Sequence, residues 1–196
     1  MSFTLVVVAV LMLALAMAGC QTAAAPPERA GAVTMRGNPL TLQGRQVNVG
    51  DPAPAFTAVA NDLSTFTFNP RSGTVWIIAS VPSLDTPVCS TETRRFNQEA
   101  TNLPGVKVLT ISMDLPFAQK RWCGAEGVQN LQTVSDFRDR SFSENYGVRI
   151  KENGLLARTV FVVDKNGKVV YKQVVPELTH EPDYAPVLAA AKQAAA

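Results

Sequence analysis

The sequence predicts an α/β fold in which a mixed central sheet is flanked by helices. Strand-like apolar segments alternate with helix-like segments between residues 75 and 146. Two further strand-like runs follow, joined by Asp164-Lys165-Asn166-Gly167, and an Asn-Gly pair is typical of a tight β-hairpin turn. Apolar residues make up 46% of the 196-residue chain, which is enough for one domain with a real core.

The expected elements can be placed in chain order. An N-terminal β-hairpin is expected around Gly37-Asn38, because Gly and Asn favour tight turns. The expected strands are residues 56–59, 64–68, 75–79, 106–112, 131–134, 158–163 and 168–175. The expected helices are residues 89–101, 116–123, 141–146 and 186–195. A thioredoxin-like core is the simplest fold with this pattern and length.

The N-terminus has the features of an export signal. Residues 3–18 are almost wholly apolar and are followed by Gly19-Cys20. The segment Ala16-Met17-Ala18-Gly19-Cys20 resembles the lipobox of bacterial lipoproteins, which implies cleavage before Cys20 and a lipid on that cysteine. No Lys or Arg precedes the apolar run, and Met17 stands where Leu is commoner, so an uncleaved membrane anchor or a plain cleaved signal stays open.

These features predict three segments and a location. Residues 1–19 are expected to be the signal, residues 20–32 a flexible tether rich in Ala and Pro, and residues 33–196 the folded domain. By resemblance to lipoproteins, the protein is expected at the cell envelope, on the periplasmic side of a membrane. Gln21 after the cysteine, rather than Asp, favours the outer membrane.

Charge and cysteine spacing exclude several classes of function. The net charge is +2 and there is no long basic run, so the charge pattern gives no case for nucleic-acid binding. The single histidine, His180, excludes a histidine-rich metal site and is expected in a solvated loop. The three cysteines are Cys20, Cys89 and Cys123, and no two form a C-x-x-C pair. A zinc ribbon and a thioredoxin-type dithiol are therefore excluded, and no metal site is expected.

Cys89 is the strongest candidate for a reactive residue. It lies where a predicted strand ends and a predicted helix begins, and the helix N-terminus favours a thiolate. Residues 82–89 fit the pattern Pro-x-x-x-Thr-x-x-Cys. Pro82, which has no backbone N–H to donate, can shape the loop and shield the cysteine from water. Thr86 can hold a polar substrate oxygen against the sulfur, because its hydroxyl both donates and accepts.

This motif resembles that of the peroxiredoxins. Residues 83–89, Ser-Leu-Asp-Thr-Pro-Val-Cys, and residues 115–124 around Cys123 are similar to the bacterial thiol peroxidase branch, and the resemblance runs from about residue 33 to residue 184. It implies that Cys89 attacks a hydroperoxide and becomes a sulfenic acid. Cys123 then resolves this acid as an intramolecular disulfide, which thioredoxin or a similar donor reduces. Arg158 matches the family's active-site arginine, no cofactor is needed, and a homodimer is expected.

Other readings of the same residues stay open at this point. Exported cysteines usually pair, so the alternative is a thioredoxin-fold binding or structural module with a static Cys89–Cys123 disulfide. Arg158 could equally be a salt-bridge partner at a strand end. Trp122 and Phe117 are expected to pack around Cys123. The apolar neighbours Leu84, Val88 and Phe117 favour an alkyl group in the substrate pocket.

Overall fold

The computed structural model describes residues 25–196. Its strands are β1 (Glu28–Met35), β2 (Asn38–Gln43), β3 (Phe56–Ala60), β4 (Thr65–Phe68), β5 (Val75–Ser80), β6 (Val106–Ser112), β7 (Gln132–Ser135), β8 (Arg149–Ile150), β9 (Thr159–Val163) and β10 (Val169–Val174). Its helices are α2 (Pro87–Ala100), α3 (Pro116–Glu126), α4 (Ser141–Tyr146) and α5 (Tyr184–Ala195). The predicted signal segment and Cys20 lie outside the described residues. Between residues 25 and 196, no helix has the length and apolar character needed to cross a bilayer.

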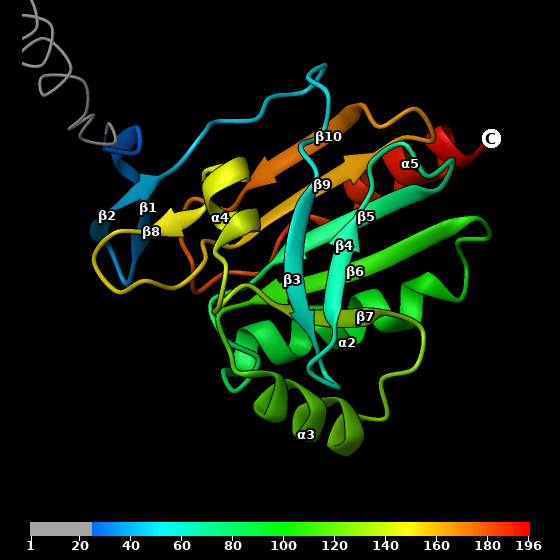
Figure 1. Ribbon diagram of the computed structural model, residues 1–196, viewed down its shortest axis with the longest axis horizontal. Coiled ribbons are helices and arrows are strands. Elements are labelled where there is room, and N and C mark those ends of the chain that lie inside the picture. The colour runs from blue at the N-terminus through cyan, green and yellow to red at the C-terminus, as the bar shows by residue number, and fades with distance from the viewer. Residues whose placement is uncertain (1–24) are drawn as a thin grey trace, which may run out of the picture.

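The strands form one large mixed sheet and one small sheet. The large sheet has the order β10-β9-β5-β6-β7-β3-β4, and the small one the order β1-β2-β8 (Figure 1). Strands β5, β6 and β7 run parallel, while β9 is antiparallel to β5 and β3 is antiparallel to β7. The predicted mixed central sheet flanked by helices is therefore confirmed.

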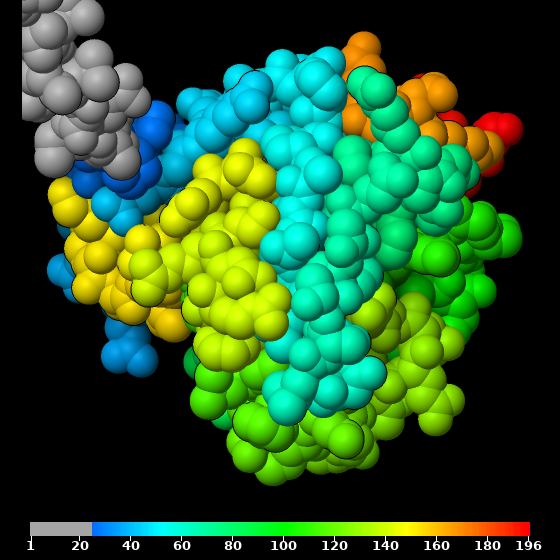
Figure 2. All heavy atoms as spheres, in the orientation of Figure 1, coloured from blue at the N-terminus to red at the C-terminus, as the bar shows by residue number. Residues whose placement is uncertain are grey.

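The central strand β5 is buried on both faces, which explains why its sequence shows no polar alternation. On one face Ile77 belongs to an apolar cluster with Phe96 of α2 and Val187 of α5. On the other face Ile78 belongs to a cluster with Phe142 of α4 and with residues of β3 and β4. The space-filling view shows α4 beside the β3–β4 hairpin on this second face (Figure 2).

Helix α2 begins earlier than the sequence indicates. Pro87 occupies its first turn and Thr86 is its N-cap residue, whereas the helix was expected from Cys89. Proline suits this place because its fixed φ is helical and its missing N–H is not needed there. Cys89 therefore lies inside the first turn of α2, and the loop of residues 81–86 joins this turn to the carboxyl end of β5.

The N-terminal hairpin is confirmed, but its turn is shifted by one residue. Arg36 and Gly37 form the turn with φ values of 52° and 78°, and Asn38 already pairs with Met35. Two successive positive φ values are what the commonest two-residue hairpin turn requires. Gly37 adopts such a value easily, whereas nothing in the composition predicts an arginine there.

The folded chain also begins before Val33. Strand β1 starts at Glu28, so residues 28–32, expected in the tether, belong to the hairpin. The Arg29 guanidinium donates to the carbonyl oxygens of Gly44, at 3.3 Å, and Gly147. These partners are distant in sequence, so the small and polar residues of this segment gave no local strand signal.

Two other helix boundaries matter for the site. Helix α3 continues to Glu126 and ends at Gly127, whose φ of 64° is the left-handed value usual at a helix C-cap. Cys123 therefore lies within α3, not at its end. Helix α5 starts at Tyr184 rather than at Pro186, because the Asp183 carboxylate caps it by accepting from the Ala185 N–H at 3.2 Å.

Candidate active site

The Cys89 side chain is fully buried in the first turn of α2, with an exposed fraction of 0%. Its Sγ accepts a hydrogen bond from Nη2 of Arg158 at 3.3 Å. The Thr86 hydroxyl does not cap the helix but donates to the Ser83 carbonyl at 2.8 Å. The sulfur thus has a cationic donor on one side and the N-terminus of a helix on the other, and both place positive charge beside it.

Arg158, which directly precedes β9, is fixed by three partners and is only 1% exposed. Its Nε and Nη2 donate to the Leu178 carbonyl at 3.2 and 2.9 Å, and its Nη1 donates to the Glu92 carboxylate. Burial disfavours the charged guanidinium, but the Glu92 carboxylate and the Cys89 sulfur outweigh it and raise the pKa of Arg158. The guanidinium therefore stays charged against the sulfur.

Glu92 completes this buried group, and sequence reasoning missed it. It lies on the same face of α2 as Cys89, three positions later, and is 0% exposed. Its Oε1 has no hydrogen-bond partner among the described residues. Burial raises the pKa of Glu92 to about 7, although the neighbouring Arg158 acts in the opposite direction. A carboxylate at this helical spacing from the cysteine was the available signal.

A largely apolar cavity of about 630 Å³ opens beside this group. Pro82, Thr86 and Arg158, the candidates from the motif and the resemblance, all line it. The remaining lining comes from the start of α2, the β1–β2 hairpin and the 178–179 loop, namely Met35, Arg36, Asn38, Leu40, Pro87, Val88, Leu178 and Thr179. The hairpin's contribution was not predicted, because it depends on how the small sheet packs against the large one.

The apolar neighbours of Cys89 divide into three cases. Val88 lines the cavity, whereas Leu84 is buried in a cluster with Cys89 and Trp122. Phe117 is 63% exposed and does not line the cavity, so the prediction that it packs around Cys123 is wrong. Its place in the first turn of α3 turns the ring outward. Trp122 packs as predicted, and its Nε1 donates to the Ser90 hydroxyl at 3.2 Å.

Cys123 is half-buried and meets polar groups of the sheet. Its Sγ lies 3.3 Å from the Thr133 hydroxyl oxygen and accepts from Nδ2 of Asn61 at 3.9 Å. Cys89 and Cys123 are both free thiols in this structure. The structure therefore shows a reduced form, and the Cys89–Cys123 disulfide stays a prediction.

The register of the strands shows that the residues in contact with the two thiols lie at different places in the sheet. Thr159, Ser80, Ile111 and Val134 pair in one row across β9, β5, β6 and β7. Arg158, which contacts Cys89, precedes the first residue of this row, and Thr133, which contacts Cys123, precedes the last. Neighbouring strands lie about 4.8 Å apart, so Thr159 and Val134, at the two ends of this row, are roughly 14 Å apart. The two sulfurs are thus held by different parts of the sheet, Cys89 through Arg158 beside β9 and Cys123 through Thr133 on β7.

Other candidate groups lie elsewhere. Arg94 pairs with Glu126 at 3.1 Å, and the guanidinium of Arg95 lies 4.3 Å from the centre of the Tyr184 ring. His180 is exposed in a loop, as expected. Within residues 25–196, no group of three His, Cys, Asp or Glu side chains is arranged to hold a metal ion.

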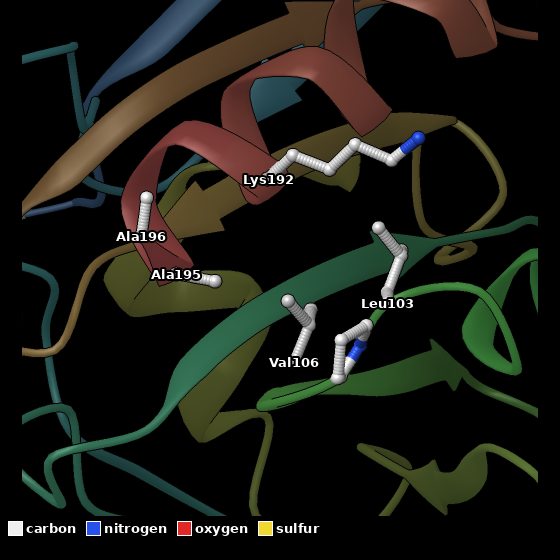
Figure 3. A pocket seen from close by; sticks show the side chains of 6 residues that line it. Leu103, Val106, Lys192, Ala195 and Ala196 are labelled. Carbon is white, nitrogen blue, oxygen red and sulfur yellow. The ribbon is translucent and has the colours of Figure 1, made fainter.

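A smaller hollow of about 230 Å³ lies at the other end of the central strands β5 and β6 (Figure 3). It is lined by Leu103, Pro104, Val106, Lys192, Ala195 and Ala196. Val106 begins β6 and pairs with the first residue of β5, whereas Cys89 follows the last residue of β5. This hollow contains no thiol and is separate from the Cys89 site.

A mixed sheet with a buried cysteine at a helix N-terminus and an arginine on its sulfur defines a thiol-dependent redox protein. The Redoxin family model matches residues 48–188. Thiol peroxidases from Halalkalibacterium halodurans and Bacillus subtilis are each 54% identical, over 83% and 82% of this chain and 98% and 96% of theirs. A peroxiredoxin-like protein from Aquifex aeolicus superposes with a TM-score of 0.80 and 48% identity, covering 84% of this chain and 97% of its own.

The chain therefore belongs to the thiol peroxidases, peroxiredoxin-type oxidoreductases of the redoxin family.

Proposed function

We propose that this chain reduces hydrogen peroxide and organic hydroperoxides, with Cys89 as the peroxidatic residue and Cys123 as the resolving residue. The observation that carries the proposal is the Arg158 guanidinium, 3.3 Å from the Cys89 sulfur at the edge of an apolar cavity. A buried cysteine whose sulfur is hydrogen-bonded to a guanidinium that lines a cavity is a nucleophile placed close to where a small substrate can bind.

The first step is nucleophilic attack on the peroxide. The Cys89 thiolate attacks the terminal oxygen of the hydroperoxide, an S–O bond forms and the O–O bond breaks. Cys89 becomes a sulfenic acid, and the departing alkoxide or hydroxide takes a proton from water. The Thr86 hydroxyl, which already donates to Ser83, presents its lone pairs to accept from the O–H of the peroxide. Arg158 stabilises the negative charge that develops as the O–O bond breaks.

The second step removes the sulfenic acid. The Cys123 thiol attacks the Cys89 sulfur, an S–S bond forms, and the hydroxyl of the sulfenic acid leaves as water with the thiol proton. A dithiol donor of the thioredoxin kind then reduces the disulfide by thiol exchange. No cofactor takes part in either step. The placement of both thiols supports this cycle over the alternative of a static disulfide, because neither sulfur is bonded and their sheet partners lie three strands apart.

The cavity supports organic hydroperoxides as substrates beside hydrogen peroxide. Its volume of about 630 Å³ exceeds what hydrogen peroxide needs, and Met35, Leu40 and Leu178 give it apolar walls. Burying an alkyl or aryl group against such walls is favourable, at roughly 25 cal/mol per Å² of apolar surface.

The test is a peroxidase assay coupled to NADPH oxidation through thioredoxin and its reductase. Cys89→Ser is expected to lose all activity, because no other side chain at the site forms a sulfenic acid. Cys123→Ser is expected to consume one equivalent of peroxide and then stop, because it has no intramolecular route to a disulfide. Full activity of Cys89→Ser would contradict the proposed function.

We also propose that the protein works at the cell envelope, anchored in a membrane by a lipid on Cys20 and joined to its folded domain by the residues that follow. The lipobox-like segment around Cys20 supports this, and it requires an electron donor outside the cytoplasm. The mass of the N-terminal peptide from the native protein tests it, because an unmodified or absent Cys20 contradicts a lipid anchor. The homodimer is proposed on family grounds, and sedimentation of the purified protein tests it.

A further inference from the structure

Three side chains form a hydrogen-bonded chain that ends on the sulfur of Cys123. The Asn61 amide Nδ2 donates to the Thr133 hydroxyl oxygen at 2.8 Å and to the Cys123 Sγ at 3.9 Å. The Thr133 oxygen lies 3.3 Å from the same sulfur. The Thr133 hydroxyl accepts from Asn61 and shares a further hydrogen bond with the Cys123 thiol, in which either group can be the donor. Thr133 is 3% exposed, so its hydroxyl has little access to water.

We propose that Thr133 and Asn61 are positioning residues that hold the Cys123 thiol against the sheet and thereby set the rate of disulfide formation. The inference rests on the proposed function, because it concerns the step in which Cys123 resolves the Cys89 sulfenic acid. Neither residue contacts the peroxide site, and neither belongs to the cysteine motifs.

The order of the strands shows that Thr133 and Asn61 hold the Cys123 thiol on the side of the sheet away from Cys89. Thr133 is in β7 and Asn61 directly follows β3, and these strands neighbour each other on the side of β6 away from β5. Cys89 follows β5 and contacts Arg158 at the start of β9. To reach Cys89, the Cys123 thiol must therefore leave both polar partners. Since Thr133 is buried, water does not replace the hydrogen bond that its hydroxyl loses as the thiol departs, and Asn61 is the one side-chain partner it keeps among the described residues, which makes the departure unfavourable.

The rate of this departure decides the fate of the sulfenic acid. If Cys123 arrives, S–S bond formation releases water and the cycle continues. If a second hydroperoxide arrives first, the sulfenic acid gains its oxygen and becomes a sulfinic acid, while the hydroperoxide leaves as the alcohol. A stronger hold on Cys123 therefore slows resolution and increases the fraction of enzyme lost to overoxidation.

The test uses Thr133→Val, which removes the hydroxyl and keeps the shape of the side chain. The reduced variant is mixed with cumene hydroperoxide and quenched with acid at successive times, and the state of each cysteine is read by mass spectrometry. Resolution is expected to be about two- to tenfold faster than in the unmodified chain, the effect of losing one hydrogen bond. The oxidation rate of Cys89 is expected to stay the same, and the sulfinic fraction at high peroxide to fall.

Two control variants distinguish the loss of the hydrogen bond between Thr133 and Cys123 from a general effect on packing. Thr133→Ser restores the hydroxyl and is expected to return the resolution rate to that of the unmodified chain. Thr110→Val makes the same substitution on β6, at the residue that pairs directly with Thr133. The Thr110 hydroxyl is buried without a partner, so this variant is expected to leave the resolution rate unchanged.

The outcomes distinguish this inference from the proposed function. If Cys89 of the unmodified chain is not oxidised by peroxide, the proposed function fails and the inference fails with it. If Cys89 is oxidised normally but Thr133→Val resolves at the same rate or more slowly, only the hold on Cys123 is refuted. Equal acceleration by Thr110→Val would also refute it, because that residue makes no bond to Cys123.

Discussion

Arg158 is one cation placed between two groups that carry negative charge when ionised. Its Nη1 meets the Glu92 carboxylate and its Nη2 meets the Cys89 sulfur. All three side chains are almost completely excluded from water. The positive charge of Arg158 therefore acts on both side chains at once. Burial nevertheless raises the pKa of Glu92 to about 7, against the opposing effect of Arg158.

Glu92→Gln tests the burial of this carboxylate through the pH dependence of stability. Burial raises the pKa of Glu92 to about 7, whereas an unfolded chain has a Glu pKa of about 4.3. Between these values the folded protein holds a proton that the unfolded chain has lost, so the stability due to Glu92 falls as the pH rises. From pH 5 to pH 8, the unmodified chain is expected to lose on the order of 3 kcal/mol relative to Glu92→Gln.

The measurement is urea unfolding of both proteins at a series of pH values. The two proteins are otherwise identical in sequence, so the pH dependence of the difference between their free energies of unfolding reports the titration of Glu92 together with the groups in contact with it. A difference that stays constant from pH 5 to pH 8 contradicts a buried carboxyl with a raised pKa.

At the scale of single residues, the sequence could predict only part of the site. Pro82, Thr86 and Cys89 belong to one local motif, and the structure places Pro82 and Thr86 in the cavity lining and Cys89 in contact with Arg158, which also lines it. Arg158 was predicted through family resemblance, because its contact with Cys89 joins residues far apart in the chain. Asn61 and Thr133 had no local signal, since their polarity acquires meaning only when β3, β7 and α3 meet.

At the scale of elements, the β1–β2 hairpin is fastened over the cavity by Glu177. One oxygen of this carboxylate accepts from the Arg36 N–H at 3.0 Å, and the other from the Gly37 N–H at 3.0 Å and the Thr34 hydroxyl at 2.8 Å. These backbone bonds and the Thr179 hydroxyl hold the pKa of Glu177 well below its ordinary value. The hairpin turn and the 177–179 loop thus act as one wall of the cavity.

Glu177→Gln is expected to loosen this wall, because an amide group replaces one acceptor oxygen with a donor that faces N–H and O–H groups. KM for cumene hydroperoxide is expected to rise about three- to tenfold, the effect of losing hydrogen bonds to a charged group. The kcat/KM for hydrogen peroxide, which does not need the wall, is expected to change less than about twofold. Steady-state kinetics with both substrates provides the measurement.

Glu152→Gln is the matched control for this prediction. The Glu152 carboxylate accepts from the Thr41 N–H at 2.9 and 3.0 Å, so it also fastens strand β2, but it does not line the cavity. An equal loss with both hydroperoxides, or the same effect in the control, contradicts a role for the Glu177 wall in binding bulky substrates.

Strands and helices were predicted best where the local sequence pattern agrees with the packing of the folded chain. The buried parallel strands β5 and β6 and the β9–β10 hairpin are confirmed close to their expected limits. The start of β1, the two-residue strand β8 and the turn at Arg36 were not predicted. Each of these depends on pairing or packing with distant residues, which leaves no periodic signal in a short polar segment.

At the scale of the whole molecule, the fold places two thiols on helices that follow different strands of one sheet. Helix α2 follows β5 and carries Cys89, whereas α3 follows β6 and carries Cys123 (Figure 1). The residues that contact the two sulfurs, Arg158 and Thr133, lie beside β9 and on β7, which are three strands apart in the sheet. In the proposed cycle, joining the two sulfurs is expected to require local rearrangement around α2, α3 or both.

The most direct test of the central claim is a single turnover of the reduced protein with one equivalent of hydrogen peroxide. The reaction is quenched at successive times, and free thiols and disulfides are mapped by mass spectrometry. Cys89 is expected to be oxidised first, and an intramolecular Cys89–Cys123 disulfide is expected to follow, with one peroxide consumed for each pair of thiols. Retention of the Cys89 thiol while peroxide persists would contradict the account.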